Sequence, residues 1–167
     1  KEILKKKKNY GRSNVKGQMS KVQIEFISAN PTGPLTLANG RGGFFGDVLS
    51  NILEFQGYKV EREYYVNDTG NQIITLGKSM AATANLIPRE ENFYQGDYIK
   101  DWANKNSAAI KKYKNNYLKI GQLAAKNFLA SIKKVLIKDS KIRFDRFTSE
   151  DRHIQNKNFK KKALAIF

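Results

Sequence analysis

The sequence predicts an α/β fold built on a parallel sheet, and three observations lead to this prediction. Apolar and polar residues alternate over 22–26, which is the period of a half-buried strand. A helical apolar pattern follows and ends near residue 56, and a second strand pattern occupies 58–66. Strand, helix and strand in this order form a βαβ unit, whose two strands are parallel and are joined by a right-handed crossover.

The segment between the first strand and the first helix is a proline- and glycine-rich loop. Pro31, Gly33 and Pro34 exclude a helix there, because proline lacks an amide hydrogen and glycine leaves the backbone unconstrained. The helical pattern begins near Arg41, and Gly57 is suited to end it. Its broad apolar face comprises Phe44, Phe45, Val48, Leu49, Ile52 and Leu53. A loop that leads into a helix N-terminus favours an anionic ligand such as a phosphate.

Helical patterns dominate the remainder of the chain. They lie over 72–85, 97–109 and 117–137, with another from Asn158 onward. Ile142 and Phe144 mark a short strand that ends in 147–150. Asp68 or Thr69 is suited to cap the helix that follows the second strand.

Composition and charge bound the class of protein. A chain of 167 residues, 40% of them hydrophobic, predicts one globular domain with a real core, and no apolar run reaches the roughly 18 residues of a membrane span. The absence of cysteine and of a secretory signal makes the cytoplasm the expected location. With His153 as the one histidine, we predict no protein-bound metal. The net charge of +16 points to polyanions, although a drift of the coding sequence toward A and T explains the lysine excess equally well.

Short motifs occur along the chain in a fixed order. The longest is EFISANPTGPL over 25–35, followed by NGRG over 39–42. Shorter motifs stand at 57–58, 62–68, 70–73, 94–99, 144–145 and 149–150. In order and spacing they resemble the signature segments of bacterial-type arginyl-tRNA synthetases, over nearly the whole chain. The resemblance implies a class I aminoacyl-tRNA synthetase, which condenses arginine with ATP and passes it to tRNA.

The same resemblance implies a domain organisation with a Rossmann-like parallel sheet and a helical connective insertion. Residues 1–21 form a basic lead-in, 22–84 the first half of the catalytic domain, 85–139 the insertion, and 140–167 the return to the sheet. Because the chain starts at Lys1 and ends in a helical pattern, we interpret it as a fragment. The second half of the nucleotide fold, a KMSKS-type loop and an anticodon-binding domain are expected outside it, so we predict that the fragment alone does not aminoacylate.

For the amino acid, the resemblance implies a rim at the end of the first strand. Ser28, Asn30 and Asn39 match the residues with which the family contacts the amino acid. Neutral hydroxyl and amide groups can fix its α-ammonium group and orient its carboxylate. Glu150 is the candidate partner of the guanidinium, since a carboxylate accepts two parallel hydrogen bonds from that planar group. Glu25 is a second acidic candidate, with the alternative that it points inward and ties neighbouring backbone together.

For the nucleotide, the resemblance implies a HIGH-type tetrapeptide, His-x-Gly-His in most of the family. In this chain its ends are Thr36 and Asn39, which we predict to be catalytic donors that replace the imidazoles at the α-phosphate. A Thr-x-x-Asn form resembles the variant of bacterial tryptophanyl enzymes. Pro34, Ala38 and Gly40 complete the predicted ATP-binding set, with Gly40 able to substitute for the usual glycine where the Ala38 methyl crowds adenine. ATP is expected with Mg²⁺.

Three polar residues after the second strand match the family's next signature. Asn67, Asp68 and Gln72 are candidate tRNA or rim contacts, with a helix cap and its supporting hydrogen bonds as the alternative. We interpret Tyr64-Tyr65 as strand packing, and Tyr98 with Trp102 as the core of the insertion.

The expected partners are ATP, L-arginine and tRNA, for a protein that is a monomer and binds no membrane. Two other functions stay open, a small nucleotidyltransferase of the same superfamily and a basic RNA-binding module without catalysis. The motif at 94–99 argues against the transferase, because a small transferase has no such insertion. An RNA-binding module would need an aromatic platform, and the sequence shows no recognisable one.

Overall fold

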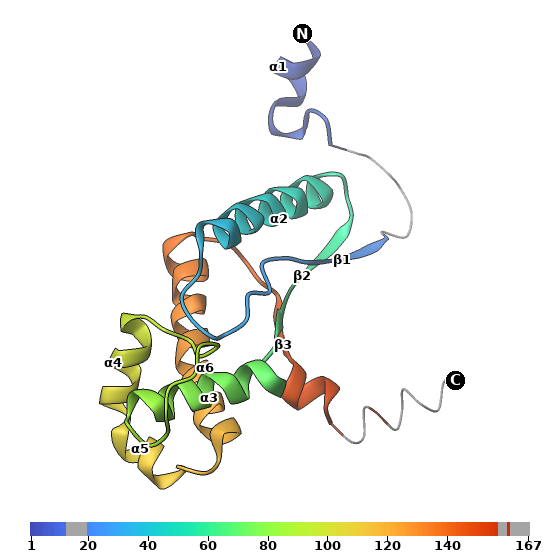
Figure 1. Cartoon of the computed structure of the whole chain (residues 1–167). Coiled ribbons are helices and arrows are strands. Elements are labelled where there is room, and N and C mark those ends of the chain that lie inside the picture. The colour runs from blue at the N-terminus through green and yellow to red at the C-terminus, as the bar shows by residue number, and fades with distance from the viewer. Residues whose placement is uncertain (13–19, 157–159, 161–167) are drawn as a thin grey trace.

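A three-stranded parallel sheet forms the centre of the computed structural model, which describes residues 1–12, 20–156 and 160 (Figure 1). The strands β1 (Lys21–Glu25), β2 (Lys59–Val66) and β3 (Arg146–Ser149) lie in that order, with β2 in the middle. Glu63 of β2 lies opposite Glu25 on one side and opposite Arg146 on the other. The predicted parallel βαβ unit and the predicted α/β fold class are therefore confirmed.

Helix α2 (Leu37–Phe55) connects β1 to β2 and begins four residues before the predicted start at Arg41. The reason is a capping box at its N-terminus: the Thr36 amide donates to Asn39 Oδ1 at 2.8 Å, and the Asn39 amide donates to Thr36 Oγ1 at 3.4 Å. Gly57, with φ of +93°, follows the last turn and ends the helix as predicted.

A close approach and a buried arginine hold α2 on the sheet. A Cβ added to Gly46 would lie 2.3 Å from the Phe26 ring, so only glycine permits this contact. Arg62 of β2 is 1% exposed and donates to Glu54 at 2.5 Å and to Asn51 at 2.9 Å. The polar side of α2 therefore faces the sheet.

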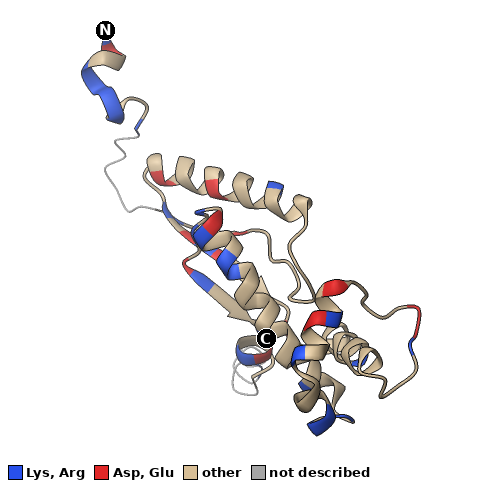
Figure 2. Cartoon of the chain, turned by 90° about the vertical axis from the view of Figure 1, so that its left-hand side faces the viewer, with Lys and Arg blue, Asp and Glu red and all other residues tan. Residues whose placement is uncertain are grey.

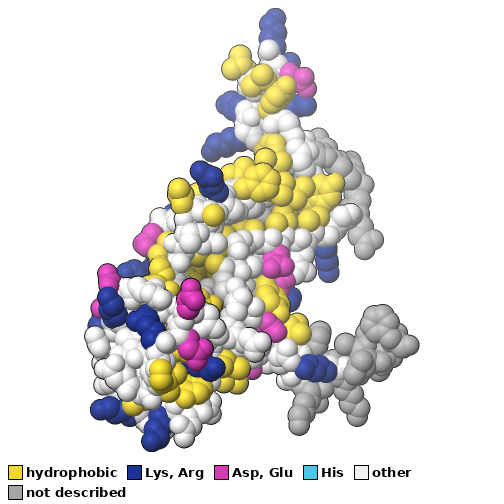
Figure 3. Space-filling view, in the orientation of Figure 1, with side chains coloured by type: hydrophobic (Ala, Val, Ile, Leu, Met, Phe, Trp, Pro, Cys, Tyr) yellow, Lys and Arg dark blue, Asp and Glu magenta, His cyan; other side chains and the backbone are white. Residues whose placement is uncertain are grey.

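The predicted apolar face of α2 is exposed as a consequence. Phe44, Phe45, Val48 and Ile52 are each more than half exposed, and Figure 3 shows apolar side chains gathered over this helix. The partners of Arg62 occupy the opposite side of the helix, so the apolar face cannot also turn toward the sheet.

Four helices beyond β2 pack into one helical unit. These are α3 (Gly70–Thr83), α4 (Asp97–Lys105), α5 (Ser107–Lys112) and α6 (Tyr117–Lys133). Trp102 belongs to their common core and Tyr98 packs against it, as predicted. A Cβ on Gly121 would lie 1.9 Å from the Ile73 carbonyl oxygen, so the backbones of α6 and α3 touch. Because α3 shares this core, the boundary between 22–84 and 85–139 stays a prediction.

A second apolar core joins the end of α6 to the sheet. It contains Phe26, Tyr64, Val66, Ile132, Leu136 and Ile142. A π-helical segment, η2 (Lys134–Asp139), extends α6 toward it. The strand predicted from Ile142 begins only at Arg146, because the Asp145 carboxylate accepts the Arg62 amide at 2.7 Å in place of a strand partner.

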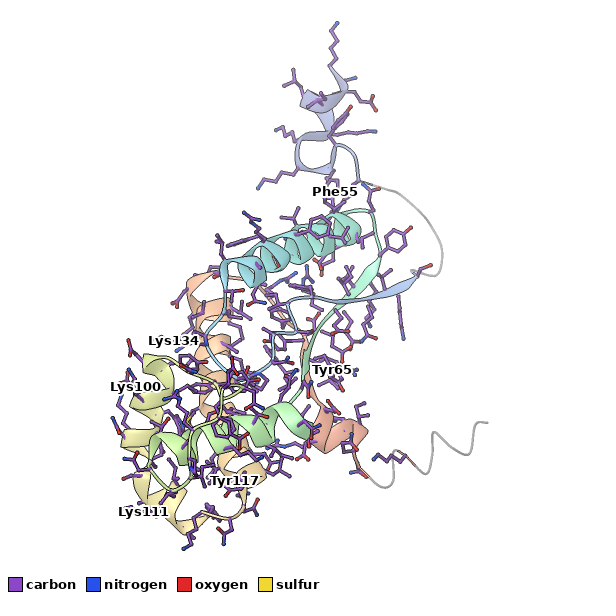
Figure 4. All side chains as sticks on the ribbon, in the orientation of Figure 1. Phe55, Tyr65, Lys100, Lys111, Tyr117 and Lys134 are labelled. Atoms are coloured by element: carbon purple, nitrogen blue, oxygen red, sulfur yellow. The ribbon has the colours of Figure 1, made fainter. Side chains whose placement is uncertain are left out.

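The basic lead-in is partly helical, with α1 (Glu2–Lys6) and a 3₁₀ turn, η1 (Lys7–Asn9). Gln56 at the end of α2 donates to the Gly11 carbonyl at 3.1 Å, so the lead-in meets the crossover helix beside Phe55 (Figure 4). After β3 comes a π-helical turn, η3 (Glu150–Ile154). Of the helix predicted from Asn158, only Lys160 is among the described residues; it is helical, and its amide donates to the Asn156 carbonyl at 3.0 Å. Within the described part, no helix is both long and apolar enough to cross a membrane.

Candidate active site

The carboxyl ends of the three strands meet at one edge of the sheet. In parallel α/β sheets ligands bind beyond this edge. The residues that follow the strand ends include the predicted candidates Ser28, Asn30, Asn67, Asp68 and Glu150. The geometry there decides which of these side chains come together.

Ser28 is held against β2 by a strained turn. Ile27 and Ser28 have φ of 66° and 40°, a conformation that a β-branched residue such as isoleucine rarely adopts. Ser28 Oγ accepts a hydrogen bond from the Tyr65 amide at 3.0 Å, and the Tyr64 hydroxyl donates to the Ala29 carbonyl at 2.8 Å. The hydroxyl hydrogen of Ser28 has no acceptor in the described chain, so it is available to a ligand.

Glu150 lies at the same edge, at the start of η3. The Asn67 side-chain amide donates to Glu150 Oε2 at 3.0 Å in the orientation that satisfies both its oxygen and its nitrogen. Gln155 donates to Glu150 Oε1 at 3.2 Å. These bonds fix the carboxylate while leaving further lone pairs on both oxygens, because a carboxylate has about four acceptor positions. The structure thus brings Asn67 and Glu150 into direct contact.

Tyr65, near the end of β2, lies close to the carboxylates of the rim; Figure 4 labels its position. Burial raises the pKa of its hydroxyl, and so do the charge and hydrogen bonding of Glu150 and the charges of Asp68 and Glu25. The charges of three carboxylates, one from near each strand end, therefore act on one phenol. This arrangement favours a cation, such as an ammonium or a guanidinium, at the rim.

Asp68 has a structural contact that the sequence did not indicate. Its carboxylate accepts from Ser149 Oγ at 2.6 Å and from the Asp151 amide at 3.0 Å, which fastens the end of β2 to the start of η3. Of the two expected caps, Thr69 occupies the N-cap position of α3 but makes no side-chain capping bond, and Asp68 does not cap the helix. Gln72 is exposed in the first turn of α3, and its side chain has no partner in the described chain.

Two further candidates for the amino acid, Glu25 and Asn30, are exposed beside this rim. Glu25 ends β1 and does not point inward, so the alternative in which it ties neighbouring backbone together is wrong. The Asn30 side-chain amide makes no hydrogen bond within the described residues. Both side chains are therefore accessible to a ligand.

At the other end of the loop, Thr36 and Asn39 bond to each other. Thr36 Oγ1 donates to Asn39 Oδ1 at 2.8 Å, so the threonine's donor is already used. Asn39 Nδ2 has no acceptor among the described residues and is the donor that the pair leaves free. It stands in the first turn of α2, where unpaired amides and the helix dipole attract an anion.

The space beside this first turn is open. A Cβ added to Gly40 would meet no atom within 4 Å, and Pro34 and Ala38 are exposed. The loop therefore leaves a free amide donor on Asn39 at one end and a free hydroxyl donor on Ser28 at the other, at the edge of the sheet where Glu150 also lies.

Tyr65 is the site residue that sequence reasoning missed, because Tyr64 and Tyr65 were interpreted together as packing residues. Tyr64 is fully buried, as expected for packing, and its ring stacks on Phe147 with centroids 5.1 Å apart. Successive residues of a strand point to opposite faces of the sheet. The adjacent positions of Tyr64 and Tyr65 therefore indicated that Tyr65 lies on the other face from the buried Tyr64.

A three-stranded parallel sheet whose first loop enters a helix N-terminus, with a helical unit between its second and third strands, matches the catalytic domain of a class I aminoacyl-tRNA synthetase. The family model for class I tRNA synthetases (R), catalytic domain, matches residues 1–161. The chain therefore belongs to the arginyl-tRNA synthetase family.

Individual relatives agree with this assignment. The chain is 41% identical over 154 residues to the arginine–tRNA ligase of Citrifermentans bemidjiense, an alignment that covers 84% of this chain and 27% of that protein. It is 46% identical over 122 residues to the Anaplasma marginale ligase, with 70% and 20% covered. A crystal structure from Campylobacter jejuni, of a protein assigned as an arginyl-tRNA synthetase, superposes with a TM-score of 0.72 at 32% identity, over 98% of this chain and 38% of that one. The chain thus spans about a quarter of the length of the curated relatives it matches.

Proposed function

We propose that the whole protein is an arginine–tRNA ligase. It converts ATP and L-arginine to arginyl-adenylate and diphosphate, then transfers the arginyl group to tRNA and releases AMP. The observation that carries this proposal is the pairing of an acidic rim around Tyr65 with a free donor at the N-terminus of α2, at the two ends of one loop. Family membership supports the same activity.

The rim residues bind and orient the amino acid. The free Ser28 hydroxyl and the Asn30 amide contact the α-ammonium and carboxylate of arginine. Glu150, fixed by Asn67, accepts two hydrogen bonds from the guanidinium, while Glu25 adds negative charge on the other side of Tyr65. Lysine cannot reproduce the planar two-bond contact, so this pairing gives discrimination as well as affinity.

The N-terminus of α2 receives the nucleotide. Asn39 Nδ2 donates to the α-phosphate as negative charge develops there, and it also reaches the arginine carboxylate that attacks it. Thr36 holds the asparagine in place through its own hydroxyl. Pro34, Ala38 and Gly40 leave open space for the rest of the nucleotide.

Mg²⁺ accompanies ATP as part of the substrate and offsets phosphate charge. The described residues contain no group of three His, Cys, Asp or Glu side chains that could hold a metal ion.

The 167-residue chain alone does not aminoacylate, because it carries only part of the donors that the transition state requires. In the whole protein Asn67, Asp68 and Gln72 lie at a rim that tRNA approaches. The whole protein acts as a monomer in the cytoplasm.

Glu150→Gln tests the amino-acid contact. The amide replaces a charged acceptor, so in the whole protein we expect KM for arginine to rise about 10- to 100-fold, with a smaller change in KM for ATP. Glu91→Gln, at an exposed site in the loop before α4, is the matched control and leaves both constants unchanged. An unchanged KM for arginine in Glu150→Gln would remove this carboxylate from the binding site.

A further inference from the structure

A pocket of about 330 Å³ lies between the first loop and the helices α4 and α6, including the extension of α6 into η2. The loop contributes Gly33, Pro34 and Leu35 to its wall. None of the residues predicted to bind arginine lines this pocket, and Pro34 is the one predicted nucleotide contact that does. The volume lies within the range of small-molecule sites, about 300–1,000 Å³. The pocket is therefore a candidate binding site apart from the arginine rim.

Three aromatic side chains form much of the apolar wall of the pocket. Tyr98 and Trp102 belong to α4, and Phe128 belongs to α6. The rings of Tyr98 and Phe128 meet edge to face, with their centroids 5.5 Å apart. The loop also packs on Tyr98, since a Cβ added to Gly33 would lie 3.1 Å from its ring. These contacts hold the rings in place without a ligand, so the pocket is preformed for an aromatic group.

Two opposite charges on α4 also line the pocket. Asp101 and Lys105 are both exposed, and their spacing of four residues places them on the same helix face with Cβ atoms about 5–6 Å apart. Within the described residues neither forms an ion pair. Asp97 and Lys100 of the same helix do pair, at 3.2 Å. Figure 2 shows both acidic and basic segments on the helical part of the chain. The charges of Asp101 and Lys105 are thus available to a ligand.

Helix α6 adds two neutral polar residues, Asn127 and Ser131, to the lining. Ser131 Oγ donates to the Asn127 carbonyl at 3.3 Å, so its hydroxyl hydrogen is already used. The Asn127 side-chain amide has no hydrogen-bond partner in the described chain, and it offers both a donor and an acceptor. The pocket therefore combines aromatic walls with one negative, one positive and one neutral polar contact.

This set of groups complements a small zwitterion that carries an aromatic ring. Its α-ammonium group pairs with Asp101, its α-carboxylate pairs with Lys105, and its ring packs against the aromatic walls. A ligand with a single charge leaves one of the two helix charges without a partner. We infer that this pocket binds a free aromatic amino acid, at a site distinct from that of arginine. Binding there does not require the proposed ligase reaction.

A ligand in this pocket contacts the first loop and the helical unit at the same time. The loop residues in its wall, 33–35, lead directly to Thr36, which caps α2. A ligand that binds only when both walls are in place stabilises that arrangement. Occupancy of the pocket therefore restrains the loop that enters α2.

The first test is isothermal titration calorimetry of the whole protein with L-phenylalanine as the probe. Phenethylamine lacks the carboxylate and 3-phenylpropionate lacks the ammonium, so each keeps the ring and one charge. We expect each of these to bind about three- to tenfold more weakly than L-phenylalanine, because one charged contact is lost at an exposed site. Saturating L-arginine leaves the dissociation constant for L-phenylalanine unchanged, because the two amino acids occupy different sites.

Variants of the whole protein locate the site. Asp101→Asn combined with Lys105→Gln raises the dissociation constant for L-phenylalanine at least about tenfold. The control, Asp97→Asn with Lys100→Gln, removes the same two charges from the same helix outside the pocket and leaves the constant unchanged; Figure 4 labels Lys100. Ser131→Phe places a ring in the pocket from an exposed position, so it abolishes binding while the fold stays intact.

Four results would overturn the inference: no saturable binding of L-phenylalanine, equally tight binding of either single-charge analogue, equal effects of the two double variants, or competition by L-arginine. Failure of the ligase proposal is read separately. A protein that binds L-phenylalanine in this pocket but charges no arginine refutes the proposed reaction and leaves the pocket assignment intact.

Discussion

Replacing Asn39 with Asp separates the two roles that the structure gives this side chain. As a cap, Asn39 uses Oδ1 to accept from the Thr36 amide and hydroxyl, both at 2.8 Å. As the proposed catalytic donor, it uses Nδ2, which has no acceptor in the described chain. Asn39→Asp keeps the acceptor and removes the donor, and its negative charge repels the α-phosphate while suiting the helix N-terminus.

The magnitudes follow from these contacts. Loss of one donor to a developing negative charge lowers kcat about 100- to 1000-fold. The unfolding free energy of Asn39→Asp changes by less than about 0.5 kcal/mol because the capping box persists. Asn39→Ala loses the same donor and also the cap, so it additionally lowers the unfolding free energy by about 1 kcal/mol. Thr36→Ser keeps the hydroxyl, and it leaves both quantities near the wild-type values.

The assay is steady-state charging of tRNA by the whole protein at saturating arginine and tRNA, paired with denaturant unfolding of each variant. A kcat for Asn39→Asp within about threefold of wild type would show that this amide does not act on the transition state. A loss of kcat that tracked only the loss of stability would assign Asn39 to capping alone.

Three further predictions concern the fold. The hydrogen bond from Arg62 lowers the pKa of Glu54 below its ordinary value of 4.5 despite partial burial, so the ionised carboxylate stabilises the fold above that pH. The loss of unfolding free energy in Glu54→Gln is therefore full at pH 7 and shrinks as the pH falls below 4.5. A loss that does not depend on pH would contradict the ion pair. Burial raises the pKa of Tyr64 to about 12, so its neutral form stabilises the fold below pH 10, and that stabilisation is lost as the pH approaches 12. The ultraviolet titration of Tyr64→Phe should lack one component near pH 12. A titration identical to that of the wild type would contradict the raised pKa. Gly121→Ala separates α3 from α6 and lowers the unfolding free energy by about 1–3 kcal/mol. The control Gly42→Ala, whose Cβ meets no atom within 4 Å, raises the unfolding free energy by about 0.5–1 kcal/mol. Equal effects of the two substitutions would contradict the close helix crossing.

The sheet was predictable because local patterns determine it. The alternation at Val22, Ile24 and Phe26 and the loop prolines specify a strand followed by a stop, and a helix before the next strand leaves a parallel pairing as the normal outcome. The anchors Tyr98 and Trp102 were predictable for the same reason, since their spacing on one helix face indicates a core.

The start and orientation of α2 were not predictable from periodicity. Asn39 and Gly40 resemble turn residues, and only their contact with Thr36 turns them into a first helical turn. The apolar stripe is the strongest amphipathic signal in the helix. Arg62, which is 1% exposed and lies only a few residues beyond the end of α2, nevertheless fixes the opposite side of the helix against the sheet.

The sequence predicted two sets of candidate residues, one for the amino acid and one for the nucleotide. The contacts among these residues are visible only in the structure. Motif order indicated Ser28 and Glu150, but it did not indicate that Tyr65 joins them or that Asn67 fixes the carboxylate. These contacts link residues far apart in the sequence, so no local pattern carries them.

The most direct test of the central claim is charging of tRNA by the whole protein with each amino acid in turn, in the presence of ATP. We expect arginine to become attached, and we expect lysine to be rejected because it cannot make the two-bond contact with Glu150. Charging with a different amino acid, or equal charging with lysine and arginine, would contradict it.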